Sequence, residues 1–190
     1  TWMAQNVPGY RGPLVLHRLS GGQSNPTWRV DAASGQYVLR QKPVGDVLPS
    51  AHQVDREYRV MKALADTPVP VPQVFALCED ASVMGSMFFV MEYLQGRTLF
   101  VPRLPGLAPD ERAAIFDQMN AAIAAISMVD PVAVGLGDYG RAGGYVERQI
   151  KRWSKQYRAS ETRSIPAMDA LIDWLPQNMP DTAEEVRLAH

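Results

Sequence analysis

The sequence predicts an α+β protein in which a β-rich part, residues 1–94, precedes a helical part, residues 95–190. Short apolar runs bounded by glycine, proline, asparagine or serine recur before residue 94, and such runs are typical of strands. After residue 109 the apolar residues recur at the spacing of a helix. Glycine and proline concentrate between these parts, which indicates a boundary there. We therefore expect five antiparallel strands with one helix, followed by a helical region.

The strands are expected at turn-bounded apolar runs. Residues 1–13 hold two glycines and two prolines and predict an irregular arm. A first strand begins at residues 14–16, and residues 19–42 predict a strand, a glycine-rich turn, a strand, a tight turn at Ser34 and Gly35, and a strand. Two further strands are predicted at residues 74–78 and 87–91.

The helix of the first part is predicted over residues 51–65, with Ser50 as its N-cap. Its apolar stripe includes Val54, Met61 and Leu64, and Glu57 lies on the same face. A carboxylate on the inward side of a helix is costly unless it is paired. A cationic partner is therefore expected for Glu57.

The preceding strand offers that partner. Alternation along residues 37–42 places Val38 and Arg40 on one face and Tyr37 and Leu39 on the other. Arg40 is therefore expected to face Glu57, and the alternative is that Glu57 pairs at the surface with one of the arginines of its own helix, Arg56 or Arg59.

A phosphate site is one interpretation of the glycine-rich turn and the strand after it. Small residues let a backbone approach phosphate oxygens closely, and the turn consists of Gly21, Gly22, Gln23, Ser24 and Asn25. The cation Arg40 could then hold a nucleotide's phosphates while the apolar Val38, two residues earlier, packs on its base. An ordinary hairpin with a solvated arginine remains the alternative.

Three helices are predicted in the second part, over residues 110–129, 145–157 and 168–175. Residues 130–144 contain five glycines and predict a loop region. The apolar residues that define the first of these helices are Ile115, Phe116, Met119, Ile123 and Ile126. Residues 186–190 look like the beginning of a strand.

Composition excludes several classes of partner. The 190 residues carry a formal net charge of −1, so no bulk field attracts nucleic acid or an anionic membrane. No window of about 18 uninterrupted apolar residues predicts a membrane span. The single cysteine, Cys78, permits no internal disulfide, and a cytoplasmic location is expected. The oligomeric state stays open.

The order of several motifs resembles one superfamily. GGQSN, YVLR, REYRVM, VPVP and FFVMEYLQGR are followed by VGLGDYGR, ERQIKRWSKQY and MDALIDWLPQNMP. Together they resemble the aminoglycoside phosphotransferase and choline kinase-like superfamily, in the subgroup related to the N-terminal kinase-like domain of acyl-CoA dehydrogenase family proteins. The resemblance implies a protein-kinase-like fold, with residues 1–94 as the N-lobe and residues 95–190 as the helical start of a C-lobe.

The resemblance also implies ATP-dependent phosphoryl transfer to a hydroxyl of a small molecule. Residues 21–25 match the loop over the phosphates, and Arg40 stands where kinases usually carry the phosphate-binding lysine. Arginine and lysine are not interchangeable at close phosphate contacts, so this substitution bears on the nucleotide geometry. Glu57 matches the helix glutamate that pairs with this cation. The hinge that contacts adenine is matched by Glu92, Tyr93 and Leu94.

The catalytic aspartates of the superfamily have no match between residues 96 and 190. His190 matches the histidine that opens the catalytic loop, with a structural role. The parent polypeptide is then expected to continue with glycine and aspartate, and the Mg²⁺ ligands are expected beyond residue 190. The 190-residue chain alone is expected to be inactive.

Three functions are compared at this point. The first is a small-molecule kinase, whose acceptor is a hydroxylated acyl compound or, within the same class, an aminoglycoside or amino alcohol. The second is a non-catalytic nucleotide-binding or regulatory module, which the missing aspartates would suit. The third is an α+β domain without a nucleotide site.

Overall fold

In a computed structural model, the protein is described over residues 1–19, 25–45, 52–140, 143–179 and 186–188. It divides into two compact units, residues 1–129 and 130–188, which are described separately below. The boundary between lobes that the sequence predicts after residue 94 stays a prediction.

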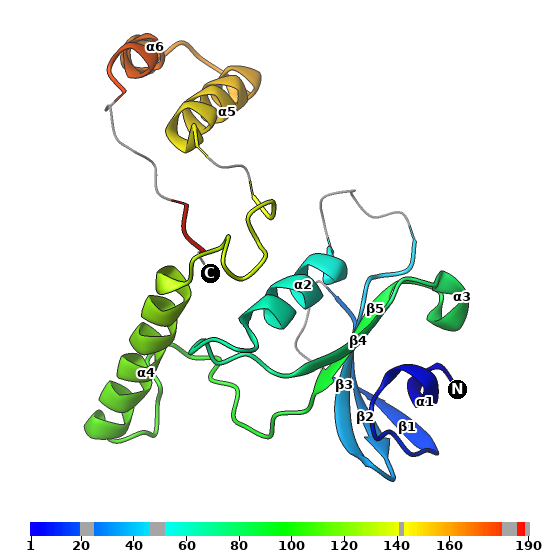
Figure 1. Ribbon diagram of the computed structural model, residues 1–190. Helices are drawn as coiled ribbons and strands as arrows, with labels where there is room; N and C mark the ends of the chain where they lie inside the picture. The colour runs from blue at the N-terminus through cyan, green and yellow to red at the C-terminus, as the bar shows by residue number, and fades with distance from the viewer. Residues whose placement is uncertain (20–24, 46–51, 141–142, 180–185, 189–190) are drawn as a thin grey trace. The chain divides into compact units, whose positions relative to one another are not determined.

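An antiparallel sheet of five strands forms the centre of the first unit (Figure 1). Its strands lie in the order β1-β2-β3-β5-β4, which confirms the predicted sheet. A two-residue turn joins β2 to β3, where Ala32 pairs with Gly35. Gly35 has φ +132°, a conformation that residues with a side chain rarely adopt. The strands are β1 (Leu14–Arg18), β2 (Thr27–Ala32), β3 (Gly35–Gln41), β4 (Val74–Cys78) and β5 (Phe88–Glu92).

One face of the sheet is covered by a short helix, α1 (Trp2–Asn6). Met3 of this helix is buried in the core together with Leu39 and Val90, and the Trp2 ring meets the Phe88 ring at 4.9 Å between centroids. The prediction of an irregular arm over residues 1–13 is therefore wrong for residues 2–6. A helix this short is not stable alone, and burial of its apolar side chains against the sheet explains why it forms.

The opposite face carries helix α2 (Val54–Leu64). Val54 and Phe89 of β5 have no exposed surface, and the Tyr58 ring packs 6.0 Å from the Phe89 ring. The helix confirms the prediction but begins at Val54, with Gln53 at its N-cap. Ser50, the predicted N-cap, lies outside the described residues.

A third short helix, α3 (Ala81–Met84), stands where the sequence predicted only a turn between two strands. Its N-cap Asp80 accepts a hydrogen bond of 2.8 Å from the Ser82 N–H. Gly85 ends it with φ +85°, as glycine commonly does after a helix.

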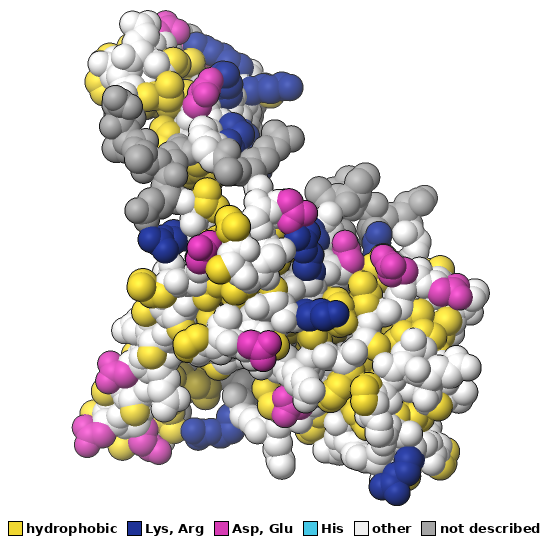
Figure 2. Space-filling view, viewed as in Figure 1, with side chains coloured by type: hydrophobic (Ala, Val, Ile, Leu, Met, Phe, Trp, Pro, Cys, Tyr) yellow, Lys and Arg dark blue, Asp and Glu magenta, His cyan; other side chains and the backbone are white. Residues whose placement is uncertain are grey.

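Three longer helices confirm the helical character of the second part. They are α4 (Pro109–Met128) in the first unit, and α5 (Tyr145–Ser160) and α6 (Pro166–Trp174) in the second. No residue of α4 is buried. Phe116, Met119 and Ile123 of its apolar stripe are about half exposed, and Figure 2 shows hydrophobic side chains on its surface. Residues 186–188 form no strand, contrary to the prediction for residues 186–190, and Ala189 and His190 lie outside the described residues. Among the described helices, none combines the length and the apolar character that a membrane crossing needs.

Candidate functional site

Arg40 and Glu57 form an ion pair between strand β3 and helix α2, as predicted. The Arg40 Nε donates to Glu57 Oε2, and its Nη2 donates to Glu57 Oε1 at 3.2 Å. Two parallel hydrogen bonds of this kind fix the orientation of a guanidinium group as well as its position. The Arg40 side chain is 26% exposed and that of Glu57 is 36% exposed, so the pair is neither fully solvated nor fully buried.

Asn25 and Thr27 extend this pair into a network. Arg40 Nη1 donates to Thr27 Oγ1 at 3.1 Å, and the Thr27 hydroxyl donates to the Asn25 carbonyl at 3.1 Å. The Asn25 side-chain amide donates to Glu57 Oε1 at 2.9 Å. Asn25 is 2% exposed. The network therefore ties β2, β3, α2 and the end of the glycine-rich segment together.

His52, which directly precedes the N-cap residue of α2, is the last member of the network. Its Nδ1 lies 2.9 Å from Asn25 Oδ1, and its backbone has φ +60°. The other predicted members of the phosphate loop are outside the described residues, namely Gly21, Gly22, Gln23 and Ser24. Their proposed role stays a prediction.

Two residues of the network were missed by the sequence reasoning. Thr27 pairs with Arg40 in the register of β2 and β3, so strand alternation across the hairpin could have identified it. His52 had no comparable signal, because its position depends on a left-handed backbone that only the folded chain reveals.

A second polar group lies on the same face of the sheet, beside Val38. Arg29 pairs with Val38 in register, and its Nη2 donates to Asp31 Oδ2 at 2.9 Å. This hydrogen bond lowers the pKa of Asp31 from its usual value. The Arg29 guanidinium also lies 6.0 Å from the centre of the Tyr93 ring. Tyr93 of the predicted hinge is therefore in contact with Arg29, the strand partner of Val38. Val38 is 7% exposed.

The predicted hinge has one backbone group already in use. The Glu92 N–H donates to the Gln73 carbonyl at 2.8 Å, and the Glu92 carboxylate accepts the Gln73 N–H at 3.2 Å. Its N–H is therefore not available to a base. Leu94 is 60% exposed, and no backbone partner within the described ranges engages its N–H. The adenine contacts expected of this segment stay a prediction.

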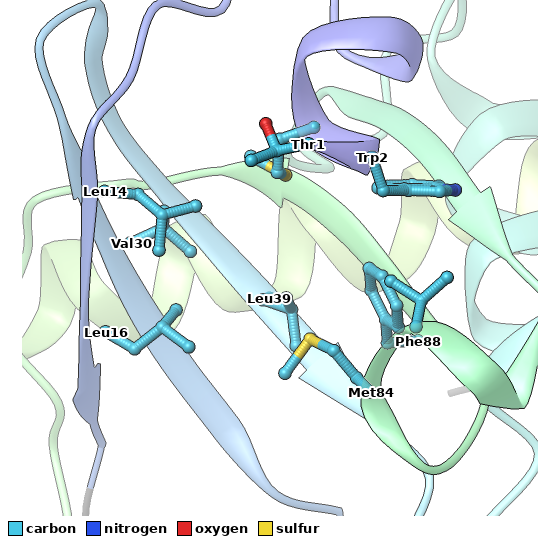
Figure 3. A pocket seen from close by; sticks show the side chains of 10 residues that line it. Thr1, Trp2, Leu14, Leu16, Val30, Leu39, Met84 and Phe88 are labelled. Carbon is cyan, nitrogen blue, oxygen red and sulfur yellow. The ribbon is translucent and has the colours of Figure 1, made fainter.

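An apolar cavity of about 210 Å³ lies on the α1 side of the sheet (Figure 3). Trp2, Leu39, Met84 and Phe88 are among its lining residues. Arg40 and Glu57 meet on the α2 side, so the cavity does not form part of the polar network. Within the residues that the structure describes, no three His, Cys, Asp or Glu side chains gather to hold a metal ion.

Comparisons with known proteins agree with this architecture. The profile of the APH phosphotransferase enzyme family matches residues 15–190. Mouse acyl-CoA dehydrogenase family member 10 is 51% identical over 169 residues, which are 89% of this chain and 16% of that protein. Rat acyl-CoA dehydrogenase family member 11 is 43% identical over 193 residues, which are 100% of this chain and 25% of that protein. The chain thus spans a quarter or less of these two relatives.

Solved structures show the same fold. A crystal structure from Ralstonia eutropha JMP134, of a protein assigned to the aminoglycoside phosphotransferases, is 53% identical with a TM-score of 0.79. The match covers 95% of this chain and 52% of that one. An aminoglycoside phosphotransferase solved with GDP and kanamycin is 15% identical with a TM-score of 0.53, over 92% of this chain and 55% of that one, and it supports the fold alone. The chain therefore belongs to the phosphotransferase enzyme family and has the protein-kinase-like fold that its motifs imply.

Proposed function

We propose that this chain forms the nucleotide-binding part of an ATP-dependent phosphotransferase that acts on a hydroxyl of a small molecule. The observation that carries the proposal is the Arg40–Glu57 pair on the face of β3, connected by Asn25 to the glycine-rich segment. A cation held rigidly beside such a segment is what the binding of phosphate groups requires.

The hydrogen bonds of Arg40 leave donors for a ligand. A guanidinium group has five N–H donors, and three of them are used by the two Glu57 oxygens and the Thr27 hydroxyl. One N–H group on Nη1 and one on Nη2 therefore remain for phosphate oxygens. Glu57 acts as the orienting group, because it fixes the guanidinium plane without supplying a contact to the ligand.

Val38, in the middle of β3 and 7% exposed, supports a base-binding role through the small surface that it leaves open. It lies on the same face as Arg40, two residues earlier, and two residues of a strand span about 7 Å. Tyr93 lies against Arg29, which is opposite Val38. This order suits a nucleotide whose base packs near Val38 and Tyr93 and whose phosphates extend toward Arg40. ATP supplies the transferred phosphoryl group, and we assign the Mg²⁺ ligands to residues beyond position 190.

A hydroxylated acyl compound is our proposed acceptor. Its support is the similarity to proteins named as acyl-CoA dehydrogenase family members, in which this chain matches one segment of a much longer polypeptide. An aminoglycoside is the competing acceptor. Such a polycation needs clustered carboxylates, and residues 110–181 contain only scattered acids.

Mg·ATP binding to the full-length polypeptide tests the proposal by isothermal titration calorimetry. We expect Arg40→Ala to weaken binding about 10- to 100-fold, since charged hydrogen bonds are lost. The control is Arg103→Ala, which removes an exposed arginine outside the network. Unchanged affinity in Arg40→Ala would exclude a phosphate role for this residue.

Phosphate transfer is then measured as ADP release with two acceptors, a hydroxyacyl-CoA and an aminoglycoside. We expect turnover with the hydroxyacyl compound. Binding of Mg·ATP without turnover of any hydroxyl acceptor would instead support the regulatory module.

A further inference from the structure

Asn25 forms hydrogen bonds within the protein through both its side chain and its backbone. Its side-chain amide donates to Glu57 Oε1 at 2.9 Å, and its backbone carbonyl accepts the Thr27 hydroxyl at 3.1 Å. The residue is 2% exposed, so its side chain has almost no surface left for a phosphate. The sequence placed Asn25 among the phosphate-contacting residues, and the geometry points to a different role.

The direction of the Asn25 amide follows from its partners. A carboxylate only accepts hydrogen bonds, so the NH₂ group of Asn25 faces Glu57 and its Oδ1 faces His52. The Nδ1 of His52, 2.9 Å from that oxygen, is consequently the donor. Glu57 fits only one orientation of the amide, and the His52 ring, as the Nδ1–H tautomer, holds that orientation from the other end.

The backbone after Asn25 is fixed as well. Asn25 precedes Pro26, and a residue before proline is restricted to extended conformations. The Pro26 carbonyl accepts the Gln41 N–H of β3 at 2.8 Å. The chain at residues 25–27 is therefore attached to β3 through its backbone and to α2 through the Asn25 side chain.

We propose that Asn25 is a positioning residue that attaches the C-terminal end of the glycine-rich segment to the Arg40–Glu57 pair, with His52 orienting its amide. This inference rests on the proposed function. By fixing residue 25 relative to Glu57, the network holds the Arg40 guanidinium and its two remaining donors in place for phosphate oxygens. The contribution of Asn25 to nucleotide binding is then indirect.

Asn25→Asp tests the amide contact with little change of shape. The substitution replaces the donor toward Glu57 with an acceptor and places two carboxylates side by side, which repel each other. We expect Mg·ATP binding by the full-length polypeptide to weaken about tenfold. Calorimetry is performed where circular dichroism shows each variant to be fully folded, because a residue that only supports folding would leave the Kd unchanged there.

Asn120→Asp is the matched control. It makes the same chemical change at an exposed position of α4 and should bind Mg·ATP as the wild type does. If Asn25→Asp binds within about twofold of wild type while folded, the positioning role is wrong.

His52 allows an independent test that separates its ring from its backbone. Glycine and asparagine both tolerate the φ of +60° at this position, but only asparagine keeps a side-chain N–H near the place of Nδ1. We expect His52→Gly to weaken Mg·ATP binding about fivefold and His52→Asn to recover most of that loss. Equal affinities of these two variants would overturn the orienting role of His52.

The results distinguish this inference from the function on which it rests. If the wild type does not bind Mg·ATP, both are wrong. If the wild type binds and Arg40→Ala weakens binding, but Asn25→Asp does not, only the positioning role is wrong. If Asn25→Asp fails to fold, the comparison of His52→Gly with His52→Asn decides the inference.

Discussion

Breaking the Arg40–Glu57 pair should destabilise the sheet and helix α2 together. Glu57 accepts two hydrogen bonds from Arg40 and one from Asn25. Arg40→Ala leaves only the Asn25 amide to satisfy a carboxylate that is 36% exposed. A carboxylate that loses its charged partner bears part of its desolvation cost without compensation.

The size of the effect follows from this intermediate exposure. Exposed ion pairs contribute about 0–1 kcal/mol, and removal of one partner from a buried pair costs about 3–5 kcal/mol. With exposed fractions of 26% and 36%, we expect Arg40→Ala to lower the free energy of unfolding by about 2 kcal/mol. Arg40→Lys keeps the charge but cannot form the two parallel bonds, so about 1 kcal/mol should be lost.

A double-mutant cycle isolates the pair. The free energy of unfolding is measured by urea denaturation, followed by tryptophan fluorescence, for Arg40→Ala, Glu57→Ala and the double variant. We expect a coupling energy of about 1.5 kcal/mol. The control Arg103→Ala should change stability by less than about 0.5 kcal/mol. A coupling energy below about 0.5 kcal/mol, the usual limit of additivity, would refute the reasoning.

Three further predictions concern packing and protonation. Phe89→Ala empties a site with no exposed surface and should cost about 3–5 kcal/mol in urea denaturation, whereas Phe116→Ala, at a position 47% exposed in this chain, should cost less than about 1 kcal/mol. Burial raises the pKa of the Cys78 thiol, so its reaction with Ellman's reagent at about pH 8 should be at least about 100-fold slower in the folded chain than in urea; equal rates would contradict its burial. Arg29 lowers the pKa of Asp31 from 3.8, so the stability that Asp31 contributes is present above that value and is lost as the pH falls through the lower folded pKa. Asp31→Asn should therefore lose less stability than wild type on acidification below pH 3.8, and a parallel decline in both would contradict this.

Local periodicity made much of the site predictable. A period of two along β3 placed Arg40 beside Val38 and opposite in direction to Leu39, and the helical spacing of α2 placed Glu57 inward. Because side-chain direction in regular elements follows from sequence spacing alone, the ion pair could be predicted before the structure. The five strands could be predicted from a second local pattern, because their apolar runs are separated by turn residues.

Sequence patterns alone were enough to predict the strands, helix α2, the three later helices and the facing of Arg40 toward Glu57. The remaining features depend on the folded chain. Helix α1 forms because Met3 finds a surface on the sheet, and five residues have too few internal hydrogen bonds to hold a helix alone. Asn25, Glu57 and His52 come together from separate segments, and no local pattern encodes which amide will face which partner. Such contacts depend on how the chain closes in space, so the role of Asn25 emerged only from the folded chain.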